Sequence, residues 1–193
     1  MILLVGGYGE SPLVQETFRN KFANLQIIIP QDCNLAVMKG AVLYGHNPLS
    51  ISARILRFSY GIRVKSRFDP EVHPWKLHYV DPDGASLCRG TFSELISKNT
   101  KVSSTGIVLH RKLFGCKASQ SGVLPVYCTE KENTTVVDDS CQLVGELNVS
   151  IPRKVFREWH VHTEFIFGLT EIKVSATVRH TNETFKRTMD LLE

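Results

Sequence analysis

The sequence predicts an α+β fold, in which a short β-α-β-α segment precedes an antiparallel β-sandwich. Residues 1–46 alternate short apolar runs with helical stripes, whereas the later part of the chain alternates strand-like runs with turn clusters. The two-residue alternation is clearest in residues 164–178, as is typical of strands that bury one face. With 193 residues, the chain is long enough for one or two domains.

The apolar run of residues 1–5 predicts a short buried strand that passes into a helix across a glycine pair. Gly6 and Gly7 lack a Cβ, so their backbone can take positive φ and lie close to a ligand. Ser11 and Pro12 are favourable first residues of a helix, whose N–H groups would face the same place. The turn predicts a phosphate or nucleotide site, and a tight turn without a ligand is an equally good interpretation.

Two better-known motifs do not fit this turn. The dinucleotide fingerprint G-x-G-x-x-G fails because Pro12 stands where the third glycine belongs. The nucleophile elbow G-x-S-x-G fails because Leu13 stands where its last glycine belongs. The turn therefore matches neither motif.

A helical stripe of apolar residues follows the turn, and residues 27–29 then form a short apolar strand. A second helix is expected from about Asn34 to a C-cap at Gly45. Gly40 costs that helix about 1 kcal/mol relative to alanine, so either something packs close to its backbone or it stands there by chance. Because two strands and two helices leave their faces exposed, residues 1–46 are expected to be the end of a larger domain.

Beyond the short connector at residues 47–51, the chain is predicted to form antiparallel strands. Strand-like runs are expected at residues 54–64, 75–80, 106–109, 123–128, 142–151 and 160–180. In the last of these, Ile172, Val174, Ala176 and Val178 are predicted to face the core, and the polar residues between them to face solvent.

Composition argues against several classes of protein. The net charge of +4 is spread along the chain without a basic run interleaved with aromatics, so no nucleic-acid partner is expected. No apolar segment is long enough to span a membrane, and no signal peptide precedes the first strand. The five cysteines lack C-x-x-C spacing, so reduced thiols in a cytoplasmic protein are expected, and a secreted, disulfide-bonded protein is the alternative.

Two motifs of the first segment resemble a known family. Residues 5–12 (Val-Gly-Gly-Tyr-Gly-Glu-Ser-Pro) and 29–45 (Ile-Pro-Gln-Asp-Cys-Asn-Leu-Ala-Val-Met-Lys-Gly-Ala-Val-Leu-Tyr-Gly) are similar to the adenosine-side end of the actin-like ATPase domain of the 70-kDa heat-shock chaperones. The Gly-Glu-Ser-Pro variant and the Ala-Val-Leu-x-Gly-His helix end resemble the divergent branch called heat shock 70 kDa protein 12. Later motifs keep the order of the family's β-sandwich substrate-binding domain, at residues 59–62, 95–100, 143–152 and 171–176.

The resemblance implies a domain organisation. Residues 1–46 would be the C-terminal piece of an actin-like, ribonuclease H-like ATPase domain, and residues 47–51 a connector. Residues 52–193 would form the β-sandwich, with an expanded segment at about residues 63–90. The chain would thus be a C-terminal fragment of an ATP-binding chaperone or of a nucleotide-gated, client-binding protein.

The resemblance also implies ATP or ADP as the cofactor, with Mg²⁺ in a full-length parent, and a peptide or protein client on the sandwich. Phosphoryl transfer needs a phosphate loop and acidic residues that hold Mg²⁺. None of those segments is found in this sequence, so no ATPase activity, catalytic residue or metal site is expected from it. His160 and His162 share a strand face, but no further ligands complete a metal site with them.

Carried over by position, Gly6 and Gly7 would lie against the ribose and α-phosphate side of the nucleotide. Tyr8 stands where the family has a small hydroxyl residue, and Glu10 where it has an arginine that stacks on adenine. The loss of the stacking arginine could remove about 1 to 2 kcal/mol of the free energy of adenine binding. Asn34 would approach the nucleotide pocket from the last helix. The competing function is a non-enzymatic interaction module, in which the glycine loop is only a turn.

In the sandwich, residues 123–127 correspond to a strand that helps form the family's peptide-binding slot. An extended peptide would be held there by backbone hydrogen bonds and a side-chain pocket. Pro125 lacks an N–H, so this strand is expected to pair only as an edge or at a bulge at that point. Val123 and Val126 can equally well be ordinary strand residues.

Overall fold

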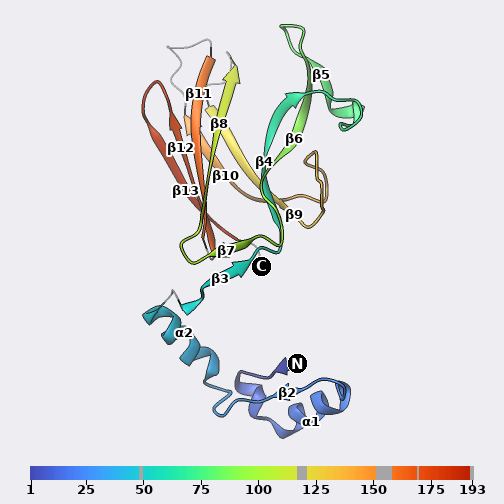
Figure 1. The fold of residues 1–193 in the computed structure, drawn as a ribbon, viewed down its shortest axis with the longest axis vertical. Helices are drawn as coiled ribbons and strands as arrows, with labels where there is room; N and C mark the ends of the chain where they lie inside the picture. Colours follow the sequence, from blue (N-terminus) through green and yellow to red (C-terminus); the bar gives the residue numbers. More distant parts are fainter. Residues whose placement is uncertain (48–49, 117–120, 151–157, 169, 192–193) are drawn as a thin grey trace. The chain divides into compact units, whose positions relative to one another are not determined.

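The computed structural model describes residues 1–47, 50–116, 121–150, 158–168 and 170–191. It divides into two compact units, Met1–Ser52 and Ala53–Glu193. Two α-helices lie in the first unit and mostly antiparallel sheets in the second, so the predicted α+β class is confirmed (Figure 1).

The N-terminal unit follows the order strand, helix, strand, helix. Its elements are β1 (Ile2–Leu3), the 3₁₀ turn η1 (Gly7–Glu10), α1 (Pro12–Lys21), β2 (Ile27–Ile28) and α2 (Ala36–His46). The two strands are parallel, with Ile2 opposite Ile27. The second helix starts two residues later than predicted and continues through Gly45 to a cap at Asn47. Gly45 keeps a negative φ, so it is part of the helix and not its C-cap.

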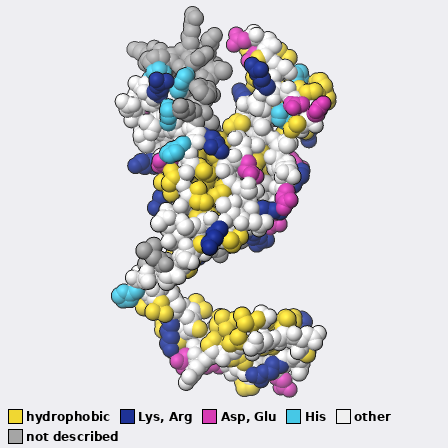
Figure 2. All heavy atoms as spheres, in the orientation of Figure 1, with side chains coloured by type: hydrophobic (Ala, Val, Ile, Leu, Met, Phe, Trp, Pro, Cys, Tyr) yellow, Lys and Arg dark blue, Asp and Glu magenta, His cyan; other side chains and the backbone are white. Residues whose placement is uncertain are grey.

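The N-terminal unit buries little apolar surface. Among its described hydrophobic side chains only Cys33 is buried. Figure 2 shows hydrophobic side chains gathered on the surface of this unit. The exposed large ones are Met1, Leu3, Val5, Tyr8, Leu13, Leu25, Leu35, Val37, Met38, Val42 and Leu43. No neighbour lies within 4 Å of a Cβ added at Gly40, so nothing described here packs against that helix backbone.

Hydrogen exchange should distinguish the two units in the 193-residue chain. Local stability follows buried apolar contact, so amides of α1 and α2 are expected to exchange at least about 100-fold faster than those of β12 (Glu171–Val178). Mass-spectrometric exchange of peptic peptides measures this difference. Equal protection of α1 and β12 would contradict the low stability inferred for residues 1–46.

The C-terminal unit is built from antiparallel strands. Its elements are β3 (Ala53–Ile55), β4 (Ser59–Arg67), the 3₁₀ turn η3 (Trp75–Leu77), β5 (His78–Val80), β6 (Ser86–Ile96), β7 (Lys101–Ser103), β8 (Ile107–Cys116), β9 (Ser121–Thr129), β10 (Gln142–Ser150), β11 (Glu158–Phe167), β12 (Glu171–Val178) and β13 (Thr184–Asp190). One sheet has the order β10-β9-β4-β6-β5 and the other β13-β12-β11-β8, while β3 pairs with β7.

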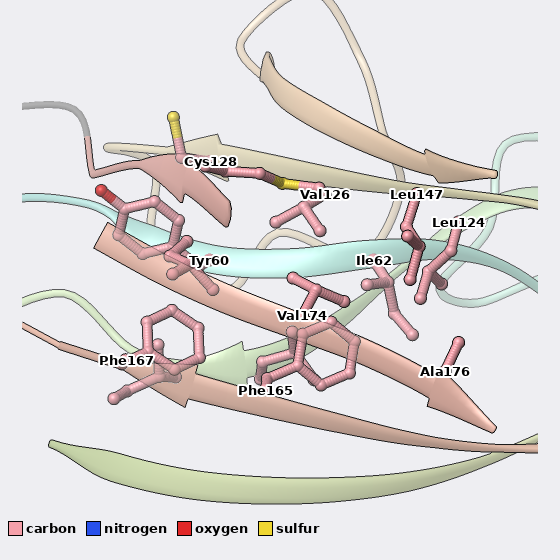
Figure 3. Close-up of a cluster of buried hydrophobic side chains, with 14 of the residues drawn as sticks. Tyr60, Ile62, Leu124, Val126, Cys128, Leu147, Phe165, Phe167, Val174 and Ala176 are labelled. Carbon is pink, nitrogen blue, oxygen red and sulfur yellow. The ribbon is translucent and has the colours of Figure 1, made fainter. Parts of the chain in front are cut away.

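The core of this unit lies between its two larger sheets. Figure 3 shows Tyr60, Ile62 and Val126 from one sheet facing Phe165, Phe167 and Val174 from the other. The rings of Tyr60 and Phe167 meet edge to face, with centroids 5.7 Å apart. This arrangement is a β-sandwich, in which apolar side chains from two facing sheets fill one core.

The predicted alternation of β12 is confirmed. Ile172, Val174, Ala176 and Val178 are all buried, and Lys173 between them is exposed. Because successive strand residues point to opposite faces, this pattern places one face on the core.

Three of the predicted runs are only partly strand, and the one at 160–180 is divided between β11 and β12. The run at 54–64 is interrupted at Leu56, whose side chain is buried and whose backbone bonds to residues 99 and 100. The run at 75–80 begins as η3 after Pro74, and only its second half is a strand. No helix in the described ranges is long and apolar enough to cross a membrane.

Strand β9 lies between β10 and β4, but its pairing with β4 stops where Ile62 faces Val126. Pro125, which precedes Val126 in β9, faces only Glu146 of β10. The proline therefore lies where β9 has one partner, as its missing N–H requires. The prediction that this strand pairs as an edge at Pro125 is confirmed.

Candidate functional site

The glycine turn after β1 is held by backbone hydrogen bonds. Gly6 has φ 93°, a conformation that favours glycine, whereas Gly7 does not adopt a positive φ. The Gly6 N–H donates to the Cys33 carbonyl at 2.8 Å, and the Gly9 N–H donates back to the Gly6 carbonyl at 2.9 Å. A Cβ added at Gly6 or Gly7 would meet no atom within 4 Å. The outer side of this turn is therefore bare backbone.

Gly9 closes the inner side of the turn. A Cβ added there would lie 3.0 Å from the Cys33 Sγ, and the Gln15 Nε2 donates to the Gly9 carbonyl at 2.7 Å. Gly9 is thus required for close packing, a role that the sequence did not reveal. These contacts fix the turn against both α1 and the segment that precedes α2.

Ser11 occupies the N-cap position of α1 and Pro12 its first position, as predicted. The Ser11 hydroxyl makes no capping hydrogen bond, and the Ser11 N–H donates to the Tyr8 carbonyl at 3.1 Å. The start of α1 therefore carries first-turn N–H groups that the Ser11 side chain does not cap.

The structure brings the predicted nucleotide-site residues into one neighbourhood. Gly6, Gly7, Tyr8 and Glu10 belong to a single turn, and Asn34 directly follows the residue that accepts the Gly6 hydrogen bond. The side chains of Tyr8, Glu10 and Asn34 are exposed, and that of Tyr8 is 84% exposed. Two segments some 25 residues apart in sequence thus present backbone and exposed side chains together.

Near this turn, Asp32 and Lys39 form an ion pair at 2.8 Å, with both side chains more than half exposed. The pair ties the loop before α2 to its second turn. Such an exposed pair contributes at most about 1 kcal/mol, so it positions the loop more than it stabilises the unit.

The predicted slot strand of the sandwich shows alternating exposure. Val126 is buried in the core, whereas Val123 is 52% exposed. A separate surface pocket of about 300 Å³ lies over β11, β12 and β13; its lining residues are Glu164, Ile166, Lys173, Val174, Ser175, Lys186, Arg187 and Thr188. This pocket does not include the residues of the predicted slot strand.

The histidines of the expanded segment have structural partners. His73 Nδ1 accepts the Asp69 N–H at 3.0 Å, and His78 Nε2 lies 2.8 Å from the Ser86 Oγ. Among the residues that the structure describes, no three His, Cys, Asp or Glu side chains are grouped so that they could hold a metal ion.

Four cysteines with described side chains are free thiols: Cys33, Cys88, Cys128 and Cys141. Burial, and secondarily the nearby Cys141, raises the pKa of Cys128 to about 11. Because a thiol reacts as the thiolate, Cys128 is unreactive near neutral pH. Its side chain acts as part of the apolar core.

A scan against models of protein families matched none of them. A comparison with curated proteins matched heat shock 70 kDa protein 12A from Mus musculus and from Homo sapiens, each 33% identical over 202 residues that cover 99% of this chain. Heat shock 70 kDa protein 12B from Homo sapiens is 28% identical over 205 residues and covers 100% of the chain. The chain spans 29% to 30% of the length of these relatives.

These relatives are the branch that the motifs at residues 5–12 and 29–45 resemble. The resemblance inferred from the sequence is therefore confirmed over nearly the whole chain.

Proposed function

Because this chain is a homologue of heat shock 70 kDa proteins 12A and 12B along nearly its whole length, we propose that it forms part of a 70-kDa heat-shock-like, nucleotide-binding protein. In this proposal residues 1–46 supply the adenosine side of an ATP or ADP site in an actin-like domain. The β-sandwich at 52–193 binds a peptide or protein client, with residues 47–51 connecting the two.

The observation that carries the proposal is the hydrogen bond from the Gly6 N–H to the Cys33 carbonyl. This bond joins the two motifs of the family resemblance, the glycine turn and the segment before α2. The bare backbone at Gly7 leaves room for a nucleotide to lie against it. The exposed apolar residues of the unit fit a domain that is completed by further chain.

Each residue of the turn has a role in the proposal. Gly6 and Gly7 lie against the ribose and α-phosphate, and Asn34 borders the pocket. Tyr8 presents an exposed ring on which the adenine can stack, in place of the arginine stacking that Glu10 cannot provide. The bound nucleotide would bring its own Mg²⁺. The proposal assigns binding, and not hydrolysis, to the residues of this chain.

Replacing Gly7 with valine tests nucleotide binding. In the full-length protein that carries this chain, Gly7→Val is expected to weaken ADP binding at least about tenfold, because the new side chain occupies the surface where the nucleotide lies. Isothermal titration calorimetry measures the dissociation constant. Gly7 has an ordinary φ and open space around it, so the substitution leaves the turn intact.

The matched control is Gly45→Val, which places the same side chain in open space near the end of α2. It is expected to change ADP affinity by less than about twofold. Binding that is absent in the parent protein, or indifferent to Gly7→Val, would overturn the nucleotide site.

The alternative function is an interaction module without a nucleotide. It is favoured by the closure of the glycine turn through its own bonds, Gly9 to Gly6 and Gln15 to Gly9, which suit a turn with no ligand. The Gly7→Val experiment decides between the two functions. The four free thiols fit a cytoplasmic protein, which is the location that we propose for either function.

A further inference from the structure

The expanded segment forms an arm built from three strands, which we define as residues 63–91. Strand β4 pairs with β9 only as far as Ile62, and beyond that point it pairs only with β6. Strand β5 then pairs with β6 from the other side. Figure 1 shows β5 with the adjoining parts of β4 and β6 at one side of the sandwich.

One side of the arm is covered by its own aromatic rings. The Phe68 ring lies 4.9 Å from that of Trp75 and 4.5 Å from that of His78, measured between centroids. Cys88, opposite His78 in the register, is fully buried beneath them. These contacts form an aromatic cluster that is separate from the sandwich core; Cys88 is buried in it, and Trp75 is 68% exposed.

The other side of the arm carries cations. Tyr79 follows His78, so its side chain points to the opposite side, together with its cross-strand neighbours. Tyr79 and Arg67 both face Leu87 in the register, and the Arg89 Cζ lies 4.2 Å from the centre of the Tyr79 ring. The cationic face, as we name it, consists of Arg63, Lys65, Arg67 and Arg89.

All four side chains of the cationic face are exposed. Within the described part of the chain, none of them has a carboxylate within 4.0 Å. Three of the four acidic residues of the loop between β9 and β10 have other partners, in the ion pairs Glu130–Arg57, Glu132–Lys98 and Asp138–Lys131. Among the described residues, the face therefore carries four positive charges that form no ion pair.

Two of these charges directly oppose each other. Lys65 faces Arg89 across the strands because Gly90, with φ 88°, is an extra residue in β6 that forms a bulge. Like charges in this position destabilise a sheet. The Tyr79 ring offsets part of that cost, since Arg89 packs over it and the Lys65 Nζ lies 5.9 Å from its centre. An anionic ligand would neutralise the remainder.

We propose that the cationic face binds an extended, acidic peptide segment of a partner protein. Residues two apart on β4 repeat every 6.6 Å or so, at about 3.3 Å per residue, and alternate side chains of an extended peptide repeat at the same spacing. A carboxylate at every second position would thus meet Arg63, Lys65 and Arg67 in turn. Arginine guanidinium groups bind carboxylates through two parallel hydrogen bonds.

A single-stranded nucleic acid fits the face less well. Such ligands gain much of their affinity by stacking bases on open aromatic rings. Here Arg89 already covers Tyr79, and the Arg63 Cζ lies 5.8 Å from the centre of the Tyr127 ring. The peptide proposal goes beyond the nucleotide-binding function and does not depend on it.

The test is fluorescence anisotropy with a fluorescein-labelled peptide of about ten residues that alternates glutamate and serine. The 193-residue chain is expected to bind this peptide, and to bind it more weakly as the salt concentration rises from about 50 mM to about 300 mM. The same peptide with glutamine in place of glutamate is expected not to bind. An oligothymidylate of about ten nucleotides serves as the nucleic-acid probe.

The double variant Lys65→Glu, Arg89→Glu is expected to lose at least about tenfold in affinity for the acidic peptide. The matched control is Lys76→Glu, Lys101→Glu, which changes the net charge equally at exposed positions outside the face. It is expected to keep its affinity within about twofold. Circular dichroism verifies that both variants are folded.

A conservative variant tests the face without reversing a charge, so it is less prone to misfold. Arg89→Lys keeps the charge but loses the planar group over Tyr79, and it is expected to weaken peptide binding about threefold. Three outcomes would each overturn the proposal: no binding of the acidic peptide, equal loss in the control variant, or tighter binding of the oligothymidylate than of the peptide.

Discussion

Replacing Phe165 with alanine is expected to lower the free energy of unfolding of the sandwich by about 3 to 5 kcal/mol. Phe165 is fully buried and faces Val174 across β11 and β12 (Figure 3). Removal of its ring takes away apolar contact and leaves a cavity, because the strands on both sides are fixed by backbone pairing.

Urea titration followed by far-ultraviolet circular dichroism measures the change. The control is Val123→Ala, since Val123 is half exposed on β9 of the same unit, and it is expected to change stability by less than about 0.5 kcal/mol. A loss below about 1 kcal/mol in Phe165→Ala would show that the two sheets do not enclose this ring.

The second large effect is expected at Gly61, where alanine should cost about 1 to 3 kcal/mol. A Cβ there would lie 2.5 Å from the Phe92 Cζ and 2.8 Å from the Ser93 carbonyl oxygen. Phe92 is buried, so its ring has little room to move, and its backbone is held by the N–H that donates to the Thr135 carbonyl at 2.9 Å. The strain therefore falls on the pairing of β4 with β6.

A double-mutant cycle with Phe92→Leu separates the ring from the backbone contribution. Leucine removes the ring atoms nearest to the new methyl group, so part of the Gly61→Ala cost should disappear in the Phe92→Leu background. The cost from the Ser93 carbonyl should remain. Strictly additive urea midpoints for the two substitutions would show that Phe92 does not pack over Gly61.

The strands that could be predicted from the sequence are those with an undisturbed two-residue period. In β12 the period is complete, because every second residue from Ile172 to Val178 packs on the core. The longest strand, β6, was missed. Its period breaks at the Gly90 bulge, so the side chains before and after that residue do not follow one alternation.

The glycine turn was predicted because Gly6 and Gly7 stand side by side in the sequence. The packing role of Gly9 depends on Cys33, which lies 24 positions further on, and only the folded chain brings the two together. The cationic face was missed for the same reason. Its charges come from β4 and β6, and the sequence has no continuous basic run to reveal them.

The side of the arm on which Arg89 lies depends on how the residues of β6 pair with β4. In β6, Arg89 precedes Gly90 and Thr91 follows it. Because Gly90 is an extra residue, the part of β6 before it is shifted by one position relative to β4. If Gly90 paired with Lys65 as an ordinary ladder residue, the part that contains Arg89 would shift by one position and face the other side. A guanidinium group would then point at the rings of Phe68 and His78, and Cys88 would face solvent. The unpaired state of one backbone position, and not the number of basic residues, thus decides which side of the arm presents charge.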